Sequence, residues 1–505
     1  MNPVKNIFSA LLLFLLLPVM DVSGQIEAGK RLEFELREGY ENFDLAQFRE
    51  NGILVFYHAE KSVKDNLTWK VDHYSTDLEI VDSKEIIISE DYRLQKTVQD
   101  DLYLYLFFLH HSDEYLFVRV NSKTLEVERM EGLLPEKTFS KEITVIDNKV
   151  IVYCTSKKSK MLRVLDFKSG AENDVAFSIE EYEPNDVSLL NIQVDDDSQE
   201  LYFFFNAKFE KSYQLYVMRF NDEAELQEKI NLSEDSPWVF STISGTFLAE
   251  GEYMFTGTYS EKSTDKSEGI FICKTTNGKK DFHKFYNFLE FEEFLSYLPE
   301  KEQDKIEKRK NKKEDQGEEL KLNYLMLSHN VRFIDGKYIY IGEAYYPTYN
   351  TYSSTNSSGL TTTTVVFAGY FYTHATVAGF DEEGEKLWDK TFEIKPKVKP
   401  FTLSEMVQVT QNSPTELGLM FASGDSVESK AINTYGEVVR DRSVKMIAKS
   451  DGDDQTKWTY SALTYWYDNF FLAHGSQLIK NIEEKGERGK RRRQVYFINK
   501  ISYSF

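Results

Sequence analysis

Cysteine and proline are scarce in this 505-residue chain, and both scarcities restrict what the protein can be. With 2 Cys it has neither a dense disulfide framework nor a CxxC redox or zinc site. Its 10 Pro and 25 Gly are too few for a disordered chain. Cys154 and Cys273 lie in apolar runs with strand character, where they form either one disulfide or two buried thiols.

An excess of basic charge is also lacking. The chain carries 61 Lys and Arg against 83 Asp and Glu, a net charge of −22, so nucleic-acid binding is excluded as its main role. It has no GxSxG elbow, HExxH helix, glycine-rich phosphate loop or EF-hand loop. These absences favour a protein without catalytic activity, cofactor or bound metal.

Long apolar runs are missing everywhere except near the N-terminus. Lys5 precedes the apolar residues 7–20, a run of about 14 residues that is too short to span a bilayer comfortably. Small residues then lead to Gly24, so residues 1–24 are typical of a secretory signal peptide cleaved after Gly24. We therefore expect a secreted or periplasmic protein with no transmembrane segment in the mature chain. An uncleaved membrane anchor is the alternative.

Aromatic residues are abundant, with 37 Phe and 31 Tyr, and they favour strands. They recur in a repeated pattern of an apolar run, a polar loop, a second run that ends in a tight turn, and a third run. The pattern occurs eight times, at a spacing of roughly 50 residues that is typical of a repeat array. The eight copies begin near Gly52, Leu102, Lys149, Glu200, Glu252, Lys337, Glu416 and Asn469.

One such antiparallel unit cannot bury both of its faces. Units stacked around an axis can, and they leave only short, protected edges. The sequence therefore predicts an all-β fold in which residues 25–505 form one β-propeller of seven or eight blades. The last copy lacks a final strand, so we expect residues 31–36 to complete it and close the ring. Two β-sandwich domains are the alternative.

One of the copies resembles a known family. Ala378, Asp381, Gly384 and Trp388 in "AGFDEEGEKLWDKTF" resemble the repeat of quinoprotein-like propellers, within the β-propeller superfamily that also holds the WD40 repeats. The resemblance covers about 15 residues of one copy and differs by one residue on each side of the Asp. It implies that Trp388 packs between blades, and it does not imply a quinone cofactor.

Two insertions interrupt the repeats. In residues 284–320, the spacing of Phe285, Phe288 and Leu295 predicts an amphipathic helix. The charged segment that follows suits a solvated helix or a mobile arm, and it is either a partner-binding arm or a solvated face. Residues 347–366 are rich in Tyr, Ser and Thr and predict a long loop on a hairpin that leaves one rim of the propeller. The basic residues 490–493 form the tip of another hairpin, whose role the sequence leaves open.

The candidate ligand-binding residues gather at the second insertion. They are Glu343, Tyr345, Tyr346, Tyr349, Tyr352 and His374. Tyrosine rings stack on sugars and peptides, so the sequence predicts an exported, non-catalytic binding or scaffold propeller with a protein or glycan partner. Packing of the hairpin alone is the plainer interpretation of the tyrosines. For Glu343 the plainer interpretation is a hydrogen bond to a neighbouring loop, and for His374 it is a structural role. A polysaccharide hydrolase or lyase is the alternative function, and it requires Glu343, His374 and a further acid to converge at the propeller centre.

Overall fold

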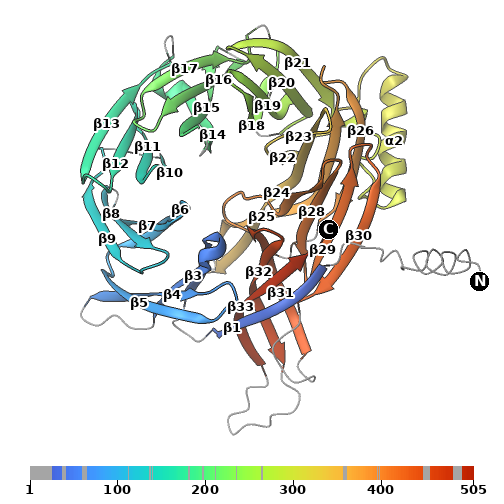
Figure 1. Ribbon diagram of the computed structural model, residues 1–505. Coiled ribbons are helices and arrows are strands. Elements are labelled where there is room, and N and C mark those ends of the chain that lie inside the picture. Colours follow the sequence, from blue (N-terminus) through green and yellow to red (C-terminus); the bar gives the residue numbers. More distant parts are fainter. Residues whose placement is uncertain are drawn as a thin grey trace, which may run out of the picture.

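Eight antiparallel sheets surround a central opening in the residues that the structure describes (Figure 1). The structure is a computed structural model and describes residues 26–504, apart from 37–40, 60–64, 112, 136–137, 139, 180–181, 196–197, 211, 235, 263–265, 356–360, 395, 397, 447–454 and 481–491. The predicted signal peptide and residues 490–491 of the basic tip at residues 490–493 lie outside the described residues. The arrangement is that of a β-propeller with eight blades, and the seven-bladed alternative is wrong.

In the first four blades the strands follow one another from the inner to the outer edge (Figure 1). Blade one contains β2 (Glu41–Gln47), β3 (Ile53–Ala59), β4 (Asn66–Tyr74) and β5 (Ile80–Ser89), with η2 (Arg49–Asn51) between its first two strands. Blade two contains β6 (Arg93–Gln99), β7 (Tyr103–His110), β8 (Glu114–Asn121) and β9 (Val127–Leu133). Blade three contains β10 (Ser140–Ile146), β11 (Lys149–Thr155), β12 (Lys160–Asp166) and β13 (Ala171–Phe177). Blade four contains β14 (Val187–Asp195), β15 (Glu200–Phe209), β16 (Ser212–Asn221) and β17 (Leu226–Asn231), preceded by η3 (Pro184–Asp186).

The remaining four blades have the same order of strands. Blade five contains β18 (Val239–Ala249), β19 (Glu252–Ser260), β20 (Gly269–Thr276) and β21 (Lys279–Asn287). Blade six contains β22 (Leu325–Ser328), β23 (Arg332–Ile334), β24 (Lys337–Thr355), β25 (Thr361–Phe380) and β26 (Lys386–Glu393), preceded by η4 (Phe288–Glu290) and α2 (Glu300–Glu314). Blade seven contains β27 (Val407–Ser413), β28 (Glu416–Ser423), β29 (Ser426–Asn433) and β30 (Val438–Lys445). Blade eight contains β31 (Gln455–Tyr467), β32 (Phe470–Lys480), β33 (Arg492–Tyr503) and β1 (Ile26–Glu35).

The eight predicted repeats correspond to the eight blades, with one correction. Each predicted copy begins at the second strand of a blade (β3, β7, β11, β15, β19, β24, β28 and β32) and not at the first. The second strand is the easiest to recognise because both of its faces are covered by neighbouring blades, as the six consecutive buried residues of β7 illustrate. The first strand lines the opening and is only partly buried over most of β14, so its sequence pattern is weaker.

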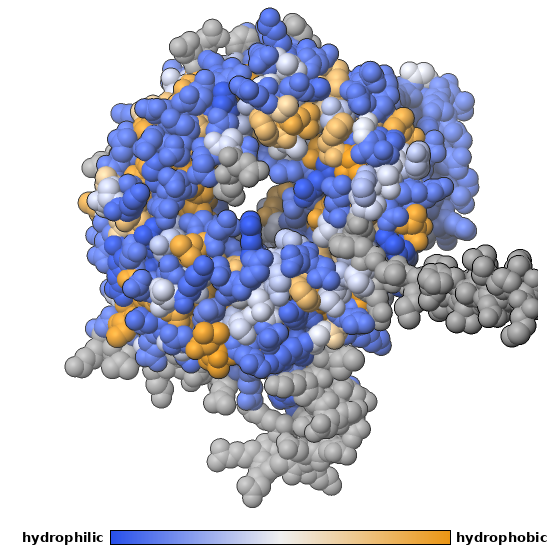
Figure 2. All heavy atoms as spheres, viewed as in Figure 1, coloured by the Kyte–Doolittle hydropathy of each residue, from blue (hydrophilic) through white to orange (hydrophobic). Residues whose placement is uncertain are grey.

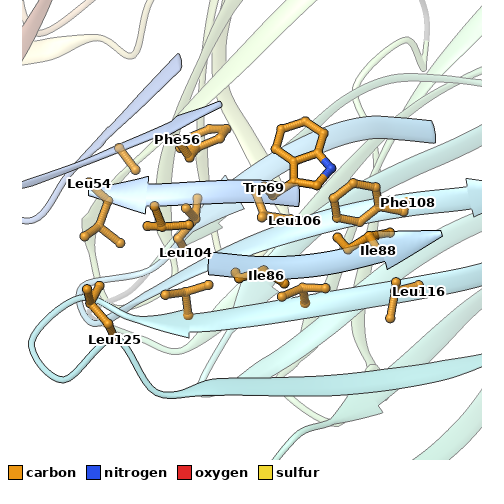
Figure 3. Close-up of a cluster of buried hydrophobic side chains, with 14 of the residues drawn as sticks. Leu54, Phe56, Trp69, Ile86, Ile88, Leu104, Leu106, Phe108, Leu116 and Leu125 are labelled. Atoms are coloured by element: carbon orange, nitrogen blue, oxygen red, sulfur yellow. The ribbon is translucent and has the colours of Figure 1, made fainter. Parts of the chain in front are cut away.

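The hydrophobic core is divided among the contacts between adjacent blades. Figure 3 shows the contact between blades one and two, where Phe56 and Trp69 lie near Phe108 of β7. The rings of Trp69 and Phe108 meet edge to face, with centroids 5.4 Å apart. Burial of one large apolar side chain contributes about 2–3 kcal/mol, so contacts of this kind repeated around the ring hold each blade to the next.

The N-terminal strand closes the ring, as the sequence predicts. β1 pairs antiparallel with β33, so that the two ends of the chain share blade eight, with Phe34 opposite Tyr496. The buried Arg31 of β1 donates to Asn499 Oδ1 of β33 (2.7 Å) and to Gln477 Oε1 of β32 (2.5 Å). One side chain therefore connects three strands of the closing blade.

Trp388 lies between blades six and seven, as its resemblance to the quinoprotein-like repeat implies. Its indole Nε1 donates to the backbone carbonyl of Thr434 in blade seven (2.9 Å). Gly436 lies against the indole ring, and a Cβ at that position would come within 2.6 Å of it. The contact requires a glycine there, which also has a positive φ of 83°.

The predicted amphipathic helix at the start of the first insertion is wrong. Phe285 belongs to β21, and Phe288, Phe291 and Phe294 are buried in a 3-10 turn and the turns that follow it. The apolar side chains pack individually against blades five and six, which does not require a helix. The helix, α2, lies instead in the charged segment, where its side chains are largely solvated.

Cys154 and Cys273 are two buried thiols, on β11 of blade three and β20 of blade five, so the disulfide alternative is wrong. Among the described residues, no helix is long and apolar enough to cross a membrane.

Candidate functional site

In the described residues, the second insertion is a long, paired hairpin. β24 and β25 pair from Tyr338 opposite Phe380 out to Thr355 opposite Thr361. β22 accompanies β24 only as far as Tyr345, and β26 accompanies β25 only from His374. Beyond these two points, within the described residues, the hairpin is a two-stranded ribbon that extends past its blade.

Most of the hairpin carries no charged residue. Residues 344–380 contain no Asp, Glu, Lys or Arg, although charged residues make up 29% of the chain. The rest of the protein is strongly acidic, so this ribbon is electrostatically distinct from the surface around it. Figure 2 shows the contrasting surface on one face of the ring, where hydrophilic residues predominate around the opening and apolar ones are scattered.

Aromatic side chains cover the base of the ribbon. Tyr346 packs beside Phe371 (ring centroids 5.3 Å apart) and Tyr349 beside Phe367 (5.9 Å), yet these tyrosines remain 48% and 58% exposed. Phe367 also contacts Phe401 (5.9 Å), which belongs to the segment that links blades six and seven and is 71% exposed. With Tyr370, which lies 5.0 Å from Phe367, the rings of Tyr349, Phe367 and Phe401 form a continuous surface that we call the aromatic base. Phe371 is adjacent to Tyr370 along β25, so the Tyr346–Phe371 pair lies on the other face of the ribbon. The aromatic base consists of Tyr349, Phe367, Tyr370 and Phe401.

The aromatic base continues into a cavity at one mouth of the central opening. Tyr370, Phe401 and Leu403 line this cavity of about 900 Å³ together with residues of the inner strands β6, β10 and β14. Its polar lining is mostly neutral, and its two charged side chains, Lys96 and Glu142, pair with each other at 2.8 Å. The neutral polar lining residues are Gln95, Thr97, Thr144, Asn191 and Thr402.

Glu343 is not part of that surface. It is fully buried, and its carboxylate accepts hydrogen bonds from the backbone N–H groups of Met406 and Val407 (3.0 Å each). It also accepts from Nε2 of His329 (2.6 Å). The carboxylate therefore joins blade six to the start of β27 in blade seven, and all of its contacts are internal.

His329, a buried residue beside the central opening, was not among the site residues predicted from the sequence. It lies at the break between β22 and β23, with Nε2 on Glu343 and Nδ1 3.5 Å from Oε2 of Glu405. Burial disfavours the imidazolium, but Glu343, by hydrogen bond and charge, and Glu405, by charge, outweigh it and raise the pKa of His329. The only sequence signal is an interruption of the apolar alternation by a His–Asn pair.

A second cavity, of about 490 Å³, adjoins His329. Tyr465 and Arg332 line it together with Glu405. Because both nitrogens of His329 face carboxylates, the ring is held as a charged partner of Glu343 and does not present a lone pair to this cavity.

His374 faces away from Glu343. Ala344 pairs with His374 and Glu343 pairs with Ala375, so the two side chains lie on opposite faces of blade six. His374 is fully buried and its ring stacks on Tyr297 at 3.8 Å. Burial lowers its pKa to about 3, which keeps the ring neutral. It holds the first insertion against the blade.

The six predicted site residues therefore divide into two groups. Glu343, Tyr345 and His374 are buried, and burial raises the pKa of Tyr345 to about 12. Tyr346, Tyr349 and Tyr352 are exposed along the ribbon. The structure does not bring Glu343 and His374 together as the enzyme alternative requires. Sequence reasoning also missed Phe401, which is distant along the chain.

Known proteins resemble this chain in structure but not in sequence. No family model matches the sequence, and no curated protein is similar to it in sequence. The chain is similar in structure to the WD40 domain of SCAP from fission yeast (8% identity, TM-score 0.41, covering 95% of this chain and 98% of that one). It is also similar to the β-propeller domain of the Trilobed protease from Pyrococcus furiosus (10%, 0.34, 78% and 97%) and to the polysaccharide lyase Uly1 (8%, 0.37, 80% and 89%). Similarities this low carry no argument about activity. The chain is an eight-bladed β-propeller.

Proposed function

We propose that this protein is an exported, non-catalytic propeller that binds a neutral glycan chain at the aromatic base and the adjoining cavity. The observation that supports this most is the continuous exposed aromatic surface from Tyr349 through Phe367 to Phe401, which ends in a mostly neutral cavity. Buried cores account for most other aromatic side chains in the molecule, but not for these.

The chemistry of this surface suits a sugar chain. Aromatic faces pack on the apolar faces of pyranose rings, while amide and hydroxyl groups such as those of Gln95, Thr144 and Asn191 bind hydroxyls. A highly charged partner is disfavoured because residues 344–380 offer it no counter-charge. Export to the periplasm or cell surface, where such glycans occur, rests on the signal-like residues 1–24.

The test is binding to an array of neutral polysaccharides. Replacing Tyr349, Phe367 and Phe401 together by Ala removes three stacking rings at about 1 kcal/mol each. We expect a loss of roughly a hundredfold in affinity. Tyr435→Ala is the matched control, because this ring is 70% exposed but lies at the β29–β30 turn of blade seven. Undiminished binding by the folded triple variant would refute the proposal, as would a wild-type protein that binds no neutral glycan.

A polysaccharide hydrolase or lyase is the second candidate function. It is favoured by one observation, the position of His329 between Glu343 and Glu405 beside a cavity that also contains Tyr465. If this site were catalytic, incubation with polysaccharide would release shorter products. The product yield would fall by at least about a hundredfold in His329→Gln, a typical loss for a general acid or base. Intact polysaccharide after incubation would exclude this candidate.

A further inference from the structure

The outer half of the hairpin has unpaired backbone edges. Beyond Asn350, β24 pairs only with β25, in an unbroken register out to Thr355 opposite Thr361. No other strand in the described part of the chain borders residues 350–355. We call residues 350–355 and 361–366 the distal ribbon. Alternate N–H and C=O groups along its β24 edge point away from β25 and face solvent.

The distal ribbon has the composition of a strand that pairs. Threonine, valine and tyrosine dominate it, and all favour extended backbone. Cross-strand hydroxyl pairs already stabilise it, between Ser353 and Thr363 (3.2 Å) and between Thr355 and Thr361 (3.0 Å). A two-stranded ribbon with both faces in water is only marginally stable by itself.

Other exposed strands of the same molecule are protected and this one is not. Natural proteins place charges on free strand edges because like charges prevent a second strand from pairing there. The outer strands of blades one, two and seven follow this rule, whereas the distal ribbon has no charged residue. The protecting charges include Asp82, Lys84 and Glu85 on β5, Glu128, Arg129 and Glu131 on β9, and Arg440, Asp441 and Arg442 on β30.

We propose that the β24 edge of the distal ribbon pairs with the same edge of a second copy of this chain. The two hairpins would join antiparallel about a twofold axis into one four-stranded sheet. Pairing of a strand with its own twofold copy covers the β24 edges of both copies at once, in a contact that is closed because each copy uses the same edge. The contact requires only hydroxyl-bearing and β-branched residues on the partner strand, and the distal ribbon of the second copy has them.

The charge distribution also favours a dimer contact at the distal ribbon over a contact elsewhere on the protein. Two copies with a net charge of −22 each repel wherever their bodies approach. The distal ribbon is neutral, and six residues at about 3.3 Å each extend it by about 20 Å, more than two Debye lengths at physiological salt. Pairing at the ribbon keeps the two acidic bodies apart. The proposal uses the distal ribbon and not the aromatic base, so it stands independently of glycan binding.

The test is the mass of the mature protein by sedimentation velocity over a range of micromolar concentrations. The variant Tyr352→Lys with Ser354→Lys places like charges about 5 Å apart across the proposed contact. The control is Thr364→Lys with Thr362→Lys, at the cross-strand partners of the same two residues. Its lysines would lie three strand spacings apart in the dimer, about 14 Å, and be screened.

We expect the wild type and the control to be dimers, and the dissociation constant of the test variant to rise at least tenfold. Circular dichroism establishes that the ring remains folded in all three. A wild type that is monomeric at every concentration overturns the proposal. The β24 edge would then be available only to a strand of a different protein. A test variant that dimerises as tightly as the control overturns it as well, because pairing would then not involve this edge.

Discussion

The strength of ring closure can be tested at one side chain. Arg31 of β1 donates hydrogen bonds to two other strands of the closing blade, to Asn499 of β33 and to Gln477 of β32. It also forms an ion pair with the buried Glu33 (2.8 Å), and its guanidinium lies 4.4 Å from the ring centroid of Phe497. The perturbation we consider is Arg31→Ala.

The expected cost follows from the groups that lose their partner. Asn499 and Gln477 would each keep a buried carbonyl oxygen without this donor, at about 1–3 kcal/mol apiece. The lost contact with Phe497 adds about 1 kcal/mol. Two effects reduce the sum: Arg493 still pairs with Glu33 (2.8 Å), and burial, which lowers the pKa of Arg31, already makes its charge costly. We expect a net loss of about 3–4 kcal/mol.

Urea denaturation followed by tryptophan fluorescence measures this loss as the change in the free energy of unfolding. The matched control is Lys30→Ala, next to Arg31 on the same strand, whose ion pair with Glu79 (3.0 Å) is exposed and contributes less than about 1 kcal/mol. A loss below about 1 kcal/mol for Arg31→Ala, equal to that of the control, would refute the claim that this residue secures the closing blade.

Three further predictions concern buried groups. Burial lowers the pKa of His374 to about 3 and of His474 to about 4, whereas an unfolded histidine binds a proton near pH 6.5. Between pH 6.5 and 4 the unfolded state therefore binds more protons than the folded state. As the pH falls through this window, the free energy of unfolding should decrease by up to about 1.4 kcal/mol per pH unit for each histidine. A free energy of unfolding that does not change with pH in urea titrations would contradict this. Glu343→Gln keeps the size of the side chain but removes the carboxylate that accepts hydrogen bonds from two backbone N–H groups and from His329. We expect the free energy of unfolding to decrease by about 2–4 kcal/mol, measured by thermal unfolding. An unchanged melting temperature would contradict this. Cys154 and Cys273 are buried, and burial raises the pKa of Cys273 to about 12, so a thiol reagent should label neither until the protein unfolds, and rapid labelling of the native protein would contradict their positions.

Much of the fold can be predicted from sequence because the signal is local. The second and third strands of each blade are buried on both faces, so their apolar runs and tight turns recur visibly along the chain. The closing strand follows from the same logic, since the last copy lacks a partner that residues 31–36 supply. The inner strands are harder to predict because one of their faces lines the opening and is partly polar.

The site could be predicted only in part. The exposed tyrosines of the hairpin are evident from composition and from their place in the repeat. Structural roles for Glu343 and His374 were the plainer interpretation of the sequence, but their partners were not predictable, because they depend on contacts made in the folded ring. Glu343 meets Met406 of the next blade, and His374 meets Tyr297 of the first insertion. Sequence spacing says nothing of either contact.

The amphipathic helix was wrongly predicted for a related physical reason, whereas the solvated helix expected as one alternative in the charged segment is present as α2. Apolar residues at three- and four-residue spacing predict a helical face, but Phe288, Phe291 and Phe294 satisfy the same spacing while packing in consecutive turns. The adjacent charged segment forms α2 from good helix formers with little burial. Tertiary packing therefore determines the structure of the first segment, and intrinsic helix propensity determines that of the charged segment.

Hydrogen exchange with and without the strongest-binding glycan of the array tests the central claim most directly, because it locates the ligand on the chain. The account predicts slower exchange in residues 346–349, 367–371 and 399–403, the aromatic base and its linking segment, with little change in the cavity beside His329. Protection confined to residues 329–332, 405–411 and 465–468, which line that second cavity, would contradict it.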